Sequence, residues 1–324
     1  MDNYRYNYII AGGTGYYDVA YSDLKKLPNV VYHNQYISGL PFGLIKLLAR
    51  VNFNIALNRF IHTPLSFLVN RFIYPDGFDD SKPRCYIFFQ NHYAVINTSY
   101  LSYLRKKHPS AKFVLYMQDI VASTPYYDMN DYKRKFDLIL SYDKGDCAKY
   151  KLTYYPTPYS KIDDTKLPQR EPIDVYYCGA GKTRYPVIFD VYKKCISEGL
   201  KCKFFVFGVP VNERITGDGL IYDQRISYVE NISYVLSSKC ILEVMQENAD
   251  GYTPRLWESI LYDKLLLTNN ISIINSNIFK RGNIHLVHKD YNIKNWINDQ
   301  VYYPNDVKLG KSPINLLKLL EHTL

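Results

Sequence analysis

Residues 174–207 read DVYYCGAGKTRYPVIFDVYKKCISEGLKCKFFVF. An apolar run is followed by the glycine-rich turn Gly179–Thr183, by an amphipathic stretch to about Gly199, and by a second apolar run, Cys202–Phe207. A strand, a turn, a helix and a second strand in this order are typical of a unit with parallel strands. The segment therefore predicts an α/β fold built on a parallel sheet.

The same alternation extends over the rest of the chain. It is interrupted between about Tyr155 and Pro172, where prolines alternate with polar residues and a linker is expected. We predict two α/β halves, residues 1–157 and 158–324. The predicted strands are Tyr8–Ala11, Val30–Tyr32, Cys85–Phe89, Lys112–Met117, Leu138–Ser141, Asp174–Cys178, Cys202–Phe207, Lys239–Met245, Leu265–Thr268 and His285–Val287.

Composition indicates a globular, basic protein. Of 324 residues, 47% are hydrophobic and 22% are charged, which excludes a wholly disordered or fibrous chain. The net charge of +9 favours anionic partners such as phosphates, nucleic acid or an anionic membrane. Six scattered cysteines without C-x-x-C spacing fit a reducing cytosol, and no signal peptide or spanning apolar stretch is recognised. We expect a soluble, cytoplasmic protein.

The first strand is followed by a glycine turn that includes Gly13, Thr14 and Gly15. Glycines allow backbone N–H groups to approach a ligand closely. The dinucleotide fingerprint G-x-G-x-x-G is not met, because Asp18 stands where its third glycine would be. A tight turn without a ligand and a ligand-facing loop both remain open, whereas NAD binding is not expected.

A second glycine turn, around Gly181, is followed by the cations Lys182 and Arg184. It is not a P-loop, because Tyr176 stands where that motif needs its first glycine. Two cations beside the start of a helix suit a diphosphate. The alternative is a solvated basic loop.

The segment from Gly251 to Glu258 contains a strong helix start. Thr253 is a suitable N-cap and Pro254 a suitable first helical residue. Glu258 could accept the hydroxyls of a ribose, and Arg255 could contact phosphate. The alternative is an internal Arg255–Glu258 pair that stabilises the helix.

Polar residues follow two predicted strands of the first half. Asn91-His92 and Gln118-Asp119 lie at strand carboxyl ends, where open α/β sheets bind ligands. Asp119 is our first candidate for a catalytic base and His92 our second, although a lone histidine is more often structural. The chain has no D-x-D motif, and a metal-independent reaction is expected.

Residues 42–74 have apolar residues at helical spacing on one face, with Lys46, Arg50 and Arg59 on others. Two interpretations remain open. The segment either packs in the core as ordinary helices or lies on an anionic membrane as an interfacial helix.

These residues resemble a known family. Asp174–Arg184, with the following helix and strand, looks like the start of the C-terminal domain in GT-B glycosyltransferases of bacterial lipopolysaccharide and capsule gene clusters. Leu242–Asn269 is similar to the donor-site block of that family, and Phe136–Asp143 resembles its interdomain segment. The likeness is more specific in the second half of the chain than in the first.

The resemblance implies two Rossmann-like domains that face each other across a cleft. The N-terminal domain would bind the acceptor and the C-terminal domain a nucleotide-sugar. The expected donor is a UDP-sugar, and no metal or other cofactor is expected. It implies transfer of a hexosyl group to a lipid-linked or oligosaccharide acceptor in cell-surface polysaccharide biosynthesis, at the inner face of the plasma membrane. Asp250 stands where the family often has a sugar-contacting glutamate, which leaves the donor sugar open. The implied donor-binding residues are Gly181, Lys182, Arg184, Asp250, Gly251, Tyr252, Thr253, Arg255 and Glu258.

Two other classes of protein are alternatives. An NAD-dependent nucleotide-sugar epimerase or reductase would explain the N-terminal glycines, and Tyr103 and Lys107 supply a weak Tyr-x-x-x-Lys match. A non-catalytic protein could bind nucleic acid through its basic surface, although no recognised reading module is present.

Overall fold

The computed structural model describes residues 4–13, 15–33, 43–52, 54, 69–70, 72–73, 77–90, 99–123, 128–246, 251–274, 276, 278–279, 282–287, 292–309 and 311–324. The chain divides into two compact units. Unit 1 comprises Met1–Ser160 with Ser312–Leu324, and unit 2 comprises Lys161–Lys311. Residues 312–324, which the sequence boundary assigned to the second half, are thus grouped with the first.

Unit 1 contains a six-stranded sheet whose strands pair in parallel in the order β2-β1-β3-β4-β5-β6. Every residue of β1 and β3 is buried, as expected for inner strands covered on both faces. The strands are β1 (Asn7–Ala11), β2 (Val30–His33), β3 (Arg84–Phe89), β4 (Lys112–Met117), β5 (Leu138–Ser141) and β6 (Thr153–Tyr154). The described helices are α1 (Tyr16–Ala20), α2 (Gly43–Asn52), α6 (Ser99–Lys107), α7 (Met129–Lys135), α8 (Lys144–Tyr150) and α13 (Ile314–Thr323).

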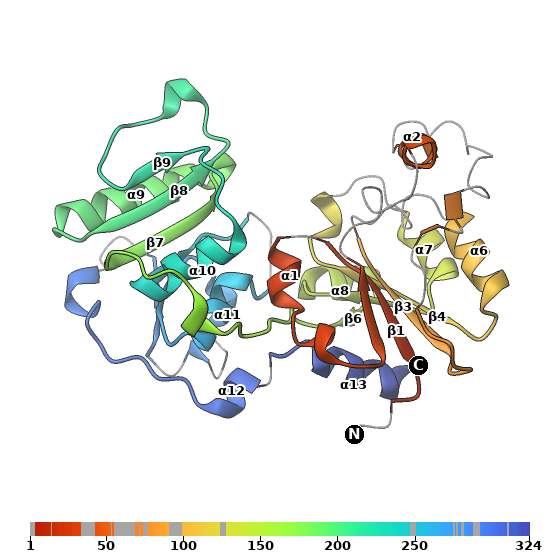
Figure 1. Cartoon of the computed structure of the whole chain (residues 1–324). Helices are drawn as coiled ribbons and strands as arrows, with labels where there is room; N and C mark the ends of the chain where they lie inside the picture. The colour runs from red at the N-terminus through yellow and green to blue at the C-terminus, as the bar shows by residue number, and fades with distance from the viewer. Residues whose placement is uncertain are drawn as a thin grey trace. The chain divides into compact units, whose positions relative to one another are not determined.

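The last helix belongs to unit 1 because of its contacts with β1 and the residues before it. Glu321 of α13 accepts the backbone N–H of Arg5 at 3.0 Å and the hydroxyl of Tyr8 at 2.7 Å. Three leucines of α13 are fully buried. Figure 1 shows α13, at the blue end of the chain, near β1.

Unit 2 contains a second six-stranded parallel sheet, in the order β12-β11-β10-β7-β8-β9. Its first helix, α9, has Pro186 in its first turn, buries residues three and four apart, and ends before Gly199, which has a φ of 74°. The strands are β7 (Ile173–Ala180), β8 (Cys202–Phe207), β9 (Leu220–Tyr222), β10 (Ser238–Glu243), β11 (Leu265–Thr268) and β12 (Ile284–Leu286). The described helices are α9 (Tyr185–Ser197), α10 (Tyr228–Ser237), α11 (Pro254–Leu261) and α12 (Asn305–Leu309).

The predicted pair of Rossmann-like α/β domains is confirmed, and each predicted strand is present with its ends shifted by at most two residues. The short strands β6 and β9 were not predicted, because two or three residues carry no periodicity. Helices α7 and α8 were also missed, although Asp128 and Asp143 cap their first turns. Of the amphipathic stretch 42–74, α2 covers Gly43–Asn52, and residues 42, 53, 55–68, 71 and 74 lie outside the described part.

Candidate functional site

The strand order of unit 2 reverses between β7 and β10. The chain runs from β7 outward to β8 and β9, and then returns to β10 on the other side of β7. In open α/β sheets, ligands bind at the carboxyl ends of such neighbouring strands. Ala180 and Glu243 end the two strands, so the segments after them form the candidate site.

The turn after β7 brings two cations to this edge of the sheet. Gly181 donates its N–H to the carbonyl of Phe207 at 2.7 Å, and a Cβ there would lie 2.6 Å from a valine side chain. Lys182 is exposed and has a φ of 45°, a conformation that side chains rarely adopt, and its ammonium has no partner among the described residues. Arg184 donates to the carbonyl of Val244 at 3.4 Å and so links the turn after β7 to the end of β10.

A buried carboxyl group, Glu243, connects the end of β10 to its neighbours. The residue is 3% exposed; one oxygen accepts the hydroxyl of Thr253, and the other accepts that of Thr268 at 2.5 Å. Burial raises the pKa of Glu243, whereas the two hydroxyls and Arg255 lower it. Sequence analysis did not single out this residue; its one signal is an acidic side chain late in an apolar run.

Helix α11 carries the next two site residues. The hydroxyl of its cap, Thr253, accepts the N–H of Arg255 at 3.2 Å, as predicted for an N-cap. The Arg255 guanidinium donates to the carbonyl of Cys178 in β7. Burial disfavours its charge, but the nearby Glu258 carboxylate raises the pKa of Arg255. Arg255 thus joins α11 to β7 and lies within electrostatic reach of Glu258.

Glu258 is 1% exposed. Its carboxylate accepts the hydroxyl of Tyr228, the first residue of α10, and the side-chain amide of Asn231 at 3.4 Å. Tyr176 in β7 donates its hydroxyl to the Asn231 oxygen at 3.0 Å. The residue predicted to contact ribose thus also belongs to a buried hydrogen-bond network between α10 and α11.

The loop between β10 and α11 is held at both ends. Met245 donates its N–H to the side-chain oxygen of Asn269, which follows β11, at 2.7 Å. The side-chain amide of Asn270 donates to the Gly251 carbonyl at 3.1 Å. The ring of Tyr252 packs edge-on against the tryptophan of α11, with ring centroids 5.4 Å apart. Asp250 lies outside the described residues.

In unit 1 the strand order reverses between β1 and β3, beside the first glycine turn. The Tyr17 ring fills the space there: a Cβ on Gly13 would lie 2.4 Å from it. Gly15 donates its N–H to the Asp18 carboxylate at 3.0 Å, so an acidic group already occupies the start of α1. This geometry favours the tight turn over the ligand-facing loop. Thr14 lies outside the described residues.

Asp119 follows β4 at the carboxyl edge of the same sheet. The side-chain oxygen of the buried Gln90 accepts the backbone N–H of Gln118 at 2.6 Å and that of Asp119 at 2.9 Å. These two hydrogen bonds hold the turn after β4. The Asp119 residue is exposed to solvent, but neighbouring groups partly desolvate its carboxyl and so raise its pKa. Burial and the Asp119 carboxylate together raise the pKa of Tyr17 to about 12. A carboxylate of raised pKa is suited to accept a proton. His92 lies outside the described residues.

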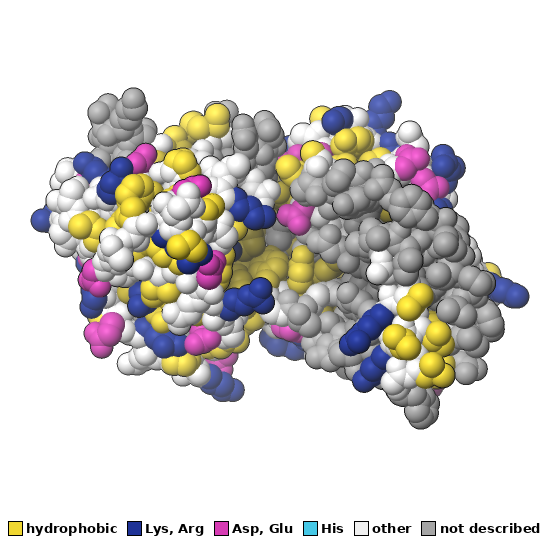
Figure 2. Space-filling model, turned by 90° about the horizontal axis from the view of Figure 1, so that it is seen from above, with side chains coloured by type: hydrophobic (Ala, Val, Ile, Leu, Met, Phe, Trp, Pro, Cys, Tyr) yellow, Lys and Arg dark blue, Asp and Glu magenta, His cyan; other side chains and the backbone are white. Residues whose placement is uncertain are grey.

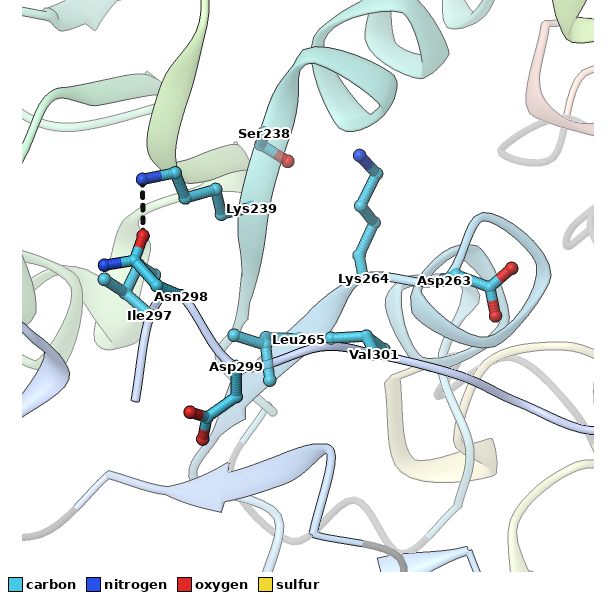
Figure 3. A pocket seen from close by; sticks show the side chains of 9 residues that line it. All are labelled: Ser238, Lys239, Asp263, Lys264, Leu265, Ile297, Asn298, Asp299 and Val301. Carbon is cyan, nitrogen blue, oxygen red and sulfur yellow. Dashed lines mark hydrogen bonds between the residues drawn. The ribbon is translucent and has the colours of Figure 1, made fainter. Parts of the chain in front are cut away.

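A pocket of about 290 Å³ lies at the opposite edge of unit 2's sheet, beside the first residues of β10 and β11 (Figure 3). Its lysines already have partners: Lys239 pairs with Asp174 at 2.9 Å, and Lys264 donates to the Leu236 carbonyl at 2.6 Å. The pocket is therefore a weaker candidate than the switch point. Among the described residues, no group of three or more His, Cys, Asp or Glu side chains could hold a metal ion.

No protein-family model and no curated protein matches this chain. Solved structures with a similar fold include AviGT4, a glycosyltransferase involved in avilamycin A biosynthesis (7% identity, 92% of this chain and 80% of that chain, TM-score 0.49). Another is an α,α-trehalose-phosphate synthase (UDP-forming) from Burkholderia vietnamiensis (10% identity, 97% of this chain and 88% of that chain, TM-score 0.47). A third is sucrose-phosphate synthase from Thermosynechococcus elongatus (11% identity, 91% of this chain and 80% of that chain, TM-score 0.45).

Proposed function

We propose that this protein is a glycosyltransferase that transfers a sugar from a nucleotide-sugar, bound by unit 2, to an acceptor held by unit 1. The observation that carries the proposal is the set of groups at the switch point of unit 2. Three cations, Lys182, Arg184 and Arg255, accompany the capped start of α11 and the carboxylate Glu258. Cations and unpaired helix N–H groups suit a diphosphate, and a carboxylate suits ribose hydroxyls.

Each of these groups has a role in the proposed reaction. Breaking the bond between sugar and diphosphate develops negative charge on the leaving group, and preorganised cations and N–H groups stabilise that charge. Lys182 and Arg184 would neutralise the diphosphate beside Gly181, and the backbone from Gly251 to Thr253 would assist. Asp250 and Tyr252 would border the donor, and Glu258 would bind the ribose.

Unit 1 would supply the acceptor site. If the anomeric configuration inverts, a base must take the proton of the acceptor hydroxyl. Asp119 would serve as this base, which its raised pKa and its position after the carboxyl end of β4 support. If the configuration is retained, Asp119 orients the acceptor instead. His92 is the second candidate for this base.

The finer proposal is a metal-independent hexosyltransferase that uses a UDP-sugar and a lipid-linked glycan acceptor in lipopolysaccharide or capsule biosynthesis, in the cytoplasm at the inner membrane face. It is supported by α2, where Leu44 and Leu47 are 67% and 57% exposed and Arg50 lies in the last turn. Figure 2 shows hydrophobic side chains beside Lys and Arg side chains at the place of α2. Such a face suits an anionic lipid surface. Within the described part of the chain, no helix is long and apolar enough to cross a bilayer.

Binding of this face to vesicles tests the membrane proposal. The wild-type chain should co-sediment with phosphatidylglycerol vesicles more than with phosphatidylcholine vesicles, and the double variant L44S/L47S should lose most of this binding. Equal binding of the wild type and the double variant would contradict a role for α2.

The two alternative classes are less well supported. A dinucleotide would have to enter the turn after β1, where Tyr17 and the Asp18 carboxylate already lie. For nucleic acid, Figure 2 shows acidic side chains interspersed among the basic ones on the face it presents.

The first test is thermal unfolding of the purified chain with UDP, GDP, CMP, TDP, NAD and NADP. A ligand at about a hundred times its Kd stabilises the folded state by about 2.7 kcal/mol, which raises Tm by about 2 °C or more. We expect a rise with a nucleoside diphosphate, with UDP first, and its loss in the Lys182→Ala/Arg184→Ala double variant. A rise with NAD or NADP alone would overturn the proposal in favour of the epimerase class.

A further inference from the structure

Lys311, the last residue of unit 2, carries a partly buried charge without a counterion. Its side chain is half-buried, and its ammonium lies 4.1 Å from the centre of the Trp257 ring. Burial lowers the pKa of Lys311, and no carboxylate of the described residues pairs with it. Lys308 differs, because it pairs with Asp263 at 2.5 Å. Removing an ammonium from water without an acidic partner is unfavourable, and an anion that binds beside it offsets this penalty.

Contacts along α11 place Lys311 near the start of that helix. Lys308 pairs with Asp263, which follows the last turn of α11. Lys311 instead lies over Trp257, the fourth residue of the helix. The Trp257 ring also packs against the ring of Tyr252, which precedes the N-cap. The Lys311 ammonium is therefore beside the first turn of α11, at the end of the helix that borders the switch point.

Lys311 and Glu258 lie on different flanks of α11. Successive residues of a helix are rotated by about 100°, so Trp257 is about 100° from Glu258 and about 160° from Arg255 around the helix axis. In the proposed function the ribose binds Glu258 and the diphosphate binds at the start of α11. The sugar is attached to the other end of the diphosphate, so it is directed past the helix start, toward the flank that carries Lys311.

Resting on the proposed function, we propose that Lys311 binds a carboxylate of the donor sugar, so that the donor is a nucleotide-linked uronic acid. The diphosphate already has three cations, Lys182, Arg184 and Arg255, whereas a neutral hexose would leave the Lys311 ammonium without a counterion. A sugar carboxylate forms a charge-assisted hydrogen bond with this ammonium, and partial exclusion of water strengthens the pair. Lys311 is thus a specificity-determining residue that separates acidic from neutral donor sugars.

Calorimetric titration of UDP, UDP-glucose, UDP-glucuronate and UDP-galacturonate into the wild type and Lys311→Met tests this. At least one of the two uronates should bind the wild type about ten times more tightly than UDP-glucose, or better. Lys311→Met should remove that preference, because the hydrogen bond to a charged group is lost. Affinities for UDP and UDP-glucose should stay within about twofold of the wild type, because neither has a sugar carboxylate.

Thermal unfolding of the free protein separates this role from a structural one. Methionine keeps an unbranched side chain on the Trp257 ring and removes a charge that burial disfavours. Because the folded state binds the Lys311 proton less readily than the unfolded state, the charge costs stability at neutral pH. Free Lys311→Met should therefore unfold at nearly the wild-type temperature. The matched control is Lys308→Met, which breaks the ion pair with Asp263; it should lower Tm and keep the preference for the uronate.

The wild-type measurement needs no variant, and binding of neither uronate more tightly than UDP-glucose overturns the inference. A preference that Lys311→Met retains overturns it as well. Equal weakening of UDP and the uronates by Lys311→Met would assign Lys311 to the diphosphate and also overturns its role on the sugar. In all three cases UDP still binds the wild type, and the proposed function stands. No binding of any nucleoside diphosphate by the wild type overturns the proposed function and this inference with it.

Discussion

Both sheets have a glycine turn after their first strand, but the two turns are followed by opposite charges. In unit 1 the Asp18 carboxylate accepts the N–H of Gly15 at 3.0 Å and pairs with Lys25 at 2.8 Å. In unit 2 the turn is followed by the cations Lys182 and Arg184. The first turn is already satisfied by an anion of its own chain, whereas the second presents positive charge at the switch point of its sheet.

The comparison indicates that glycine spacing predicts a tight turn, and that the residues after the turn determine whether a ligand can bind there. An N–H group that donates to a carboxylate has no hydrogen left for a phosphate. This contrast agrees with the proposal that unit 2 binds the donor and that unit 1 contributes Asp119. Variants in each unit test the roles proposed for the two units.

The largest effect is expected from Asp119→Asn. Loss of a general base lowers turnover by about 10²- to 10⁴-fold, while UDP affinity should change little, because the proposed donor residues lie in unit 2. Steady-state kinetics and calorimetric titration measure the two quantities. Asp131→Asn is the matched control and should keep full activity, because Asp131 is a half-buried carboxylate of α7 that pairs with Lys135 at 2.5 Å. Full activity of Asp119→Asn would remove Asp119 as a base.

The pH dependence of the wild-type activity gives a second prediction for Asp119. Partial desolvation raises the pKa of the exposed Asp119, so activity should fall, as pH decreases, at a somewhat higher pH than an ordinary aspartate with a pKa of about 3.9 would give. Because the folded state binds this proton more readily than the unfolded state, the charged form costs stability above the raised pKa. Asp119→Asn should therefore unfold at the same or a slightly higher temperature than the wild type at neutral pH.

The next largest effect is expected from removal of the Glu258 carboxylate in unit 2, compared with removal of the Glu321 carboxylate in unit 1. Glu258→Ala leaves Arg255 without its nearby countercharge and should lower the free energy of unfolding by about 3 kcal/mol and UDP affinity by more than about tenfold. Glu321→Ala removes hydrogen bonds to Arg5 and Tyr8 and should cost about 1–3 kcal/mol with unchanged UDP affinity. Urea unfolding and calorimetric titration measure both. Equal UDP affinities of the two variants would end the assignment of the donor to unit 2.

A smaller effect is expected from Lys182→Gly. The variant loses an exposed cation and should bind UDP about three to ten times more weakly. Its stability should stay nearly unchanged, because relief of the left-handed conformation, about 1 kcal/mol, offsets the entropy that glycine adds to the unfolded chain. Lys26→Ala, an exposed cation of unit 1, should leave UDP affinity unaltered. A wild-type affinity of Lys182→Gly would exclude Lys182 from the diphosphate site.

The smallest effect is expected from Asp18→Asn. The variant weakens the hydrogen bond to Gly15 and should cost less than about 1 kcal/mol of stability. Affinities for UDP and NAD should not change. Newly acquired NAD binding, or a second UDP molecule bound by the variant, would show that the turn of unit 1 is an anion site masked by Asp18, and would end the contrast between the two turns.

Features that depend on neighbours in sequence were predictable. The cap of α11 is one, because Thr253, Pro254 and the apolar face after them lie within one short segment. The glycine turns and the long strands are others, since periodicity and turn chemistry are local. Glu243 was missed because Thr268 is brought to it only by the pairing of β10 with β11, and Thr253 only by the position of α11.

The sequence by itself determined the parallel α/β class, the two glycine turns and the charges that follow them, because these properties need only adjacent residues. Tertiary structure decided which of these groups meet. It placed α13 in unit 1 through Glu321, joined Arg184 to the end of β10, and covered Glu258 with Tyr228. Each of these contacts joins residues that are remote along the chain, and their distance is set by strand order and helix packing, which no local pattern of residue types encodes.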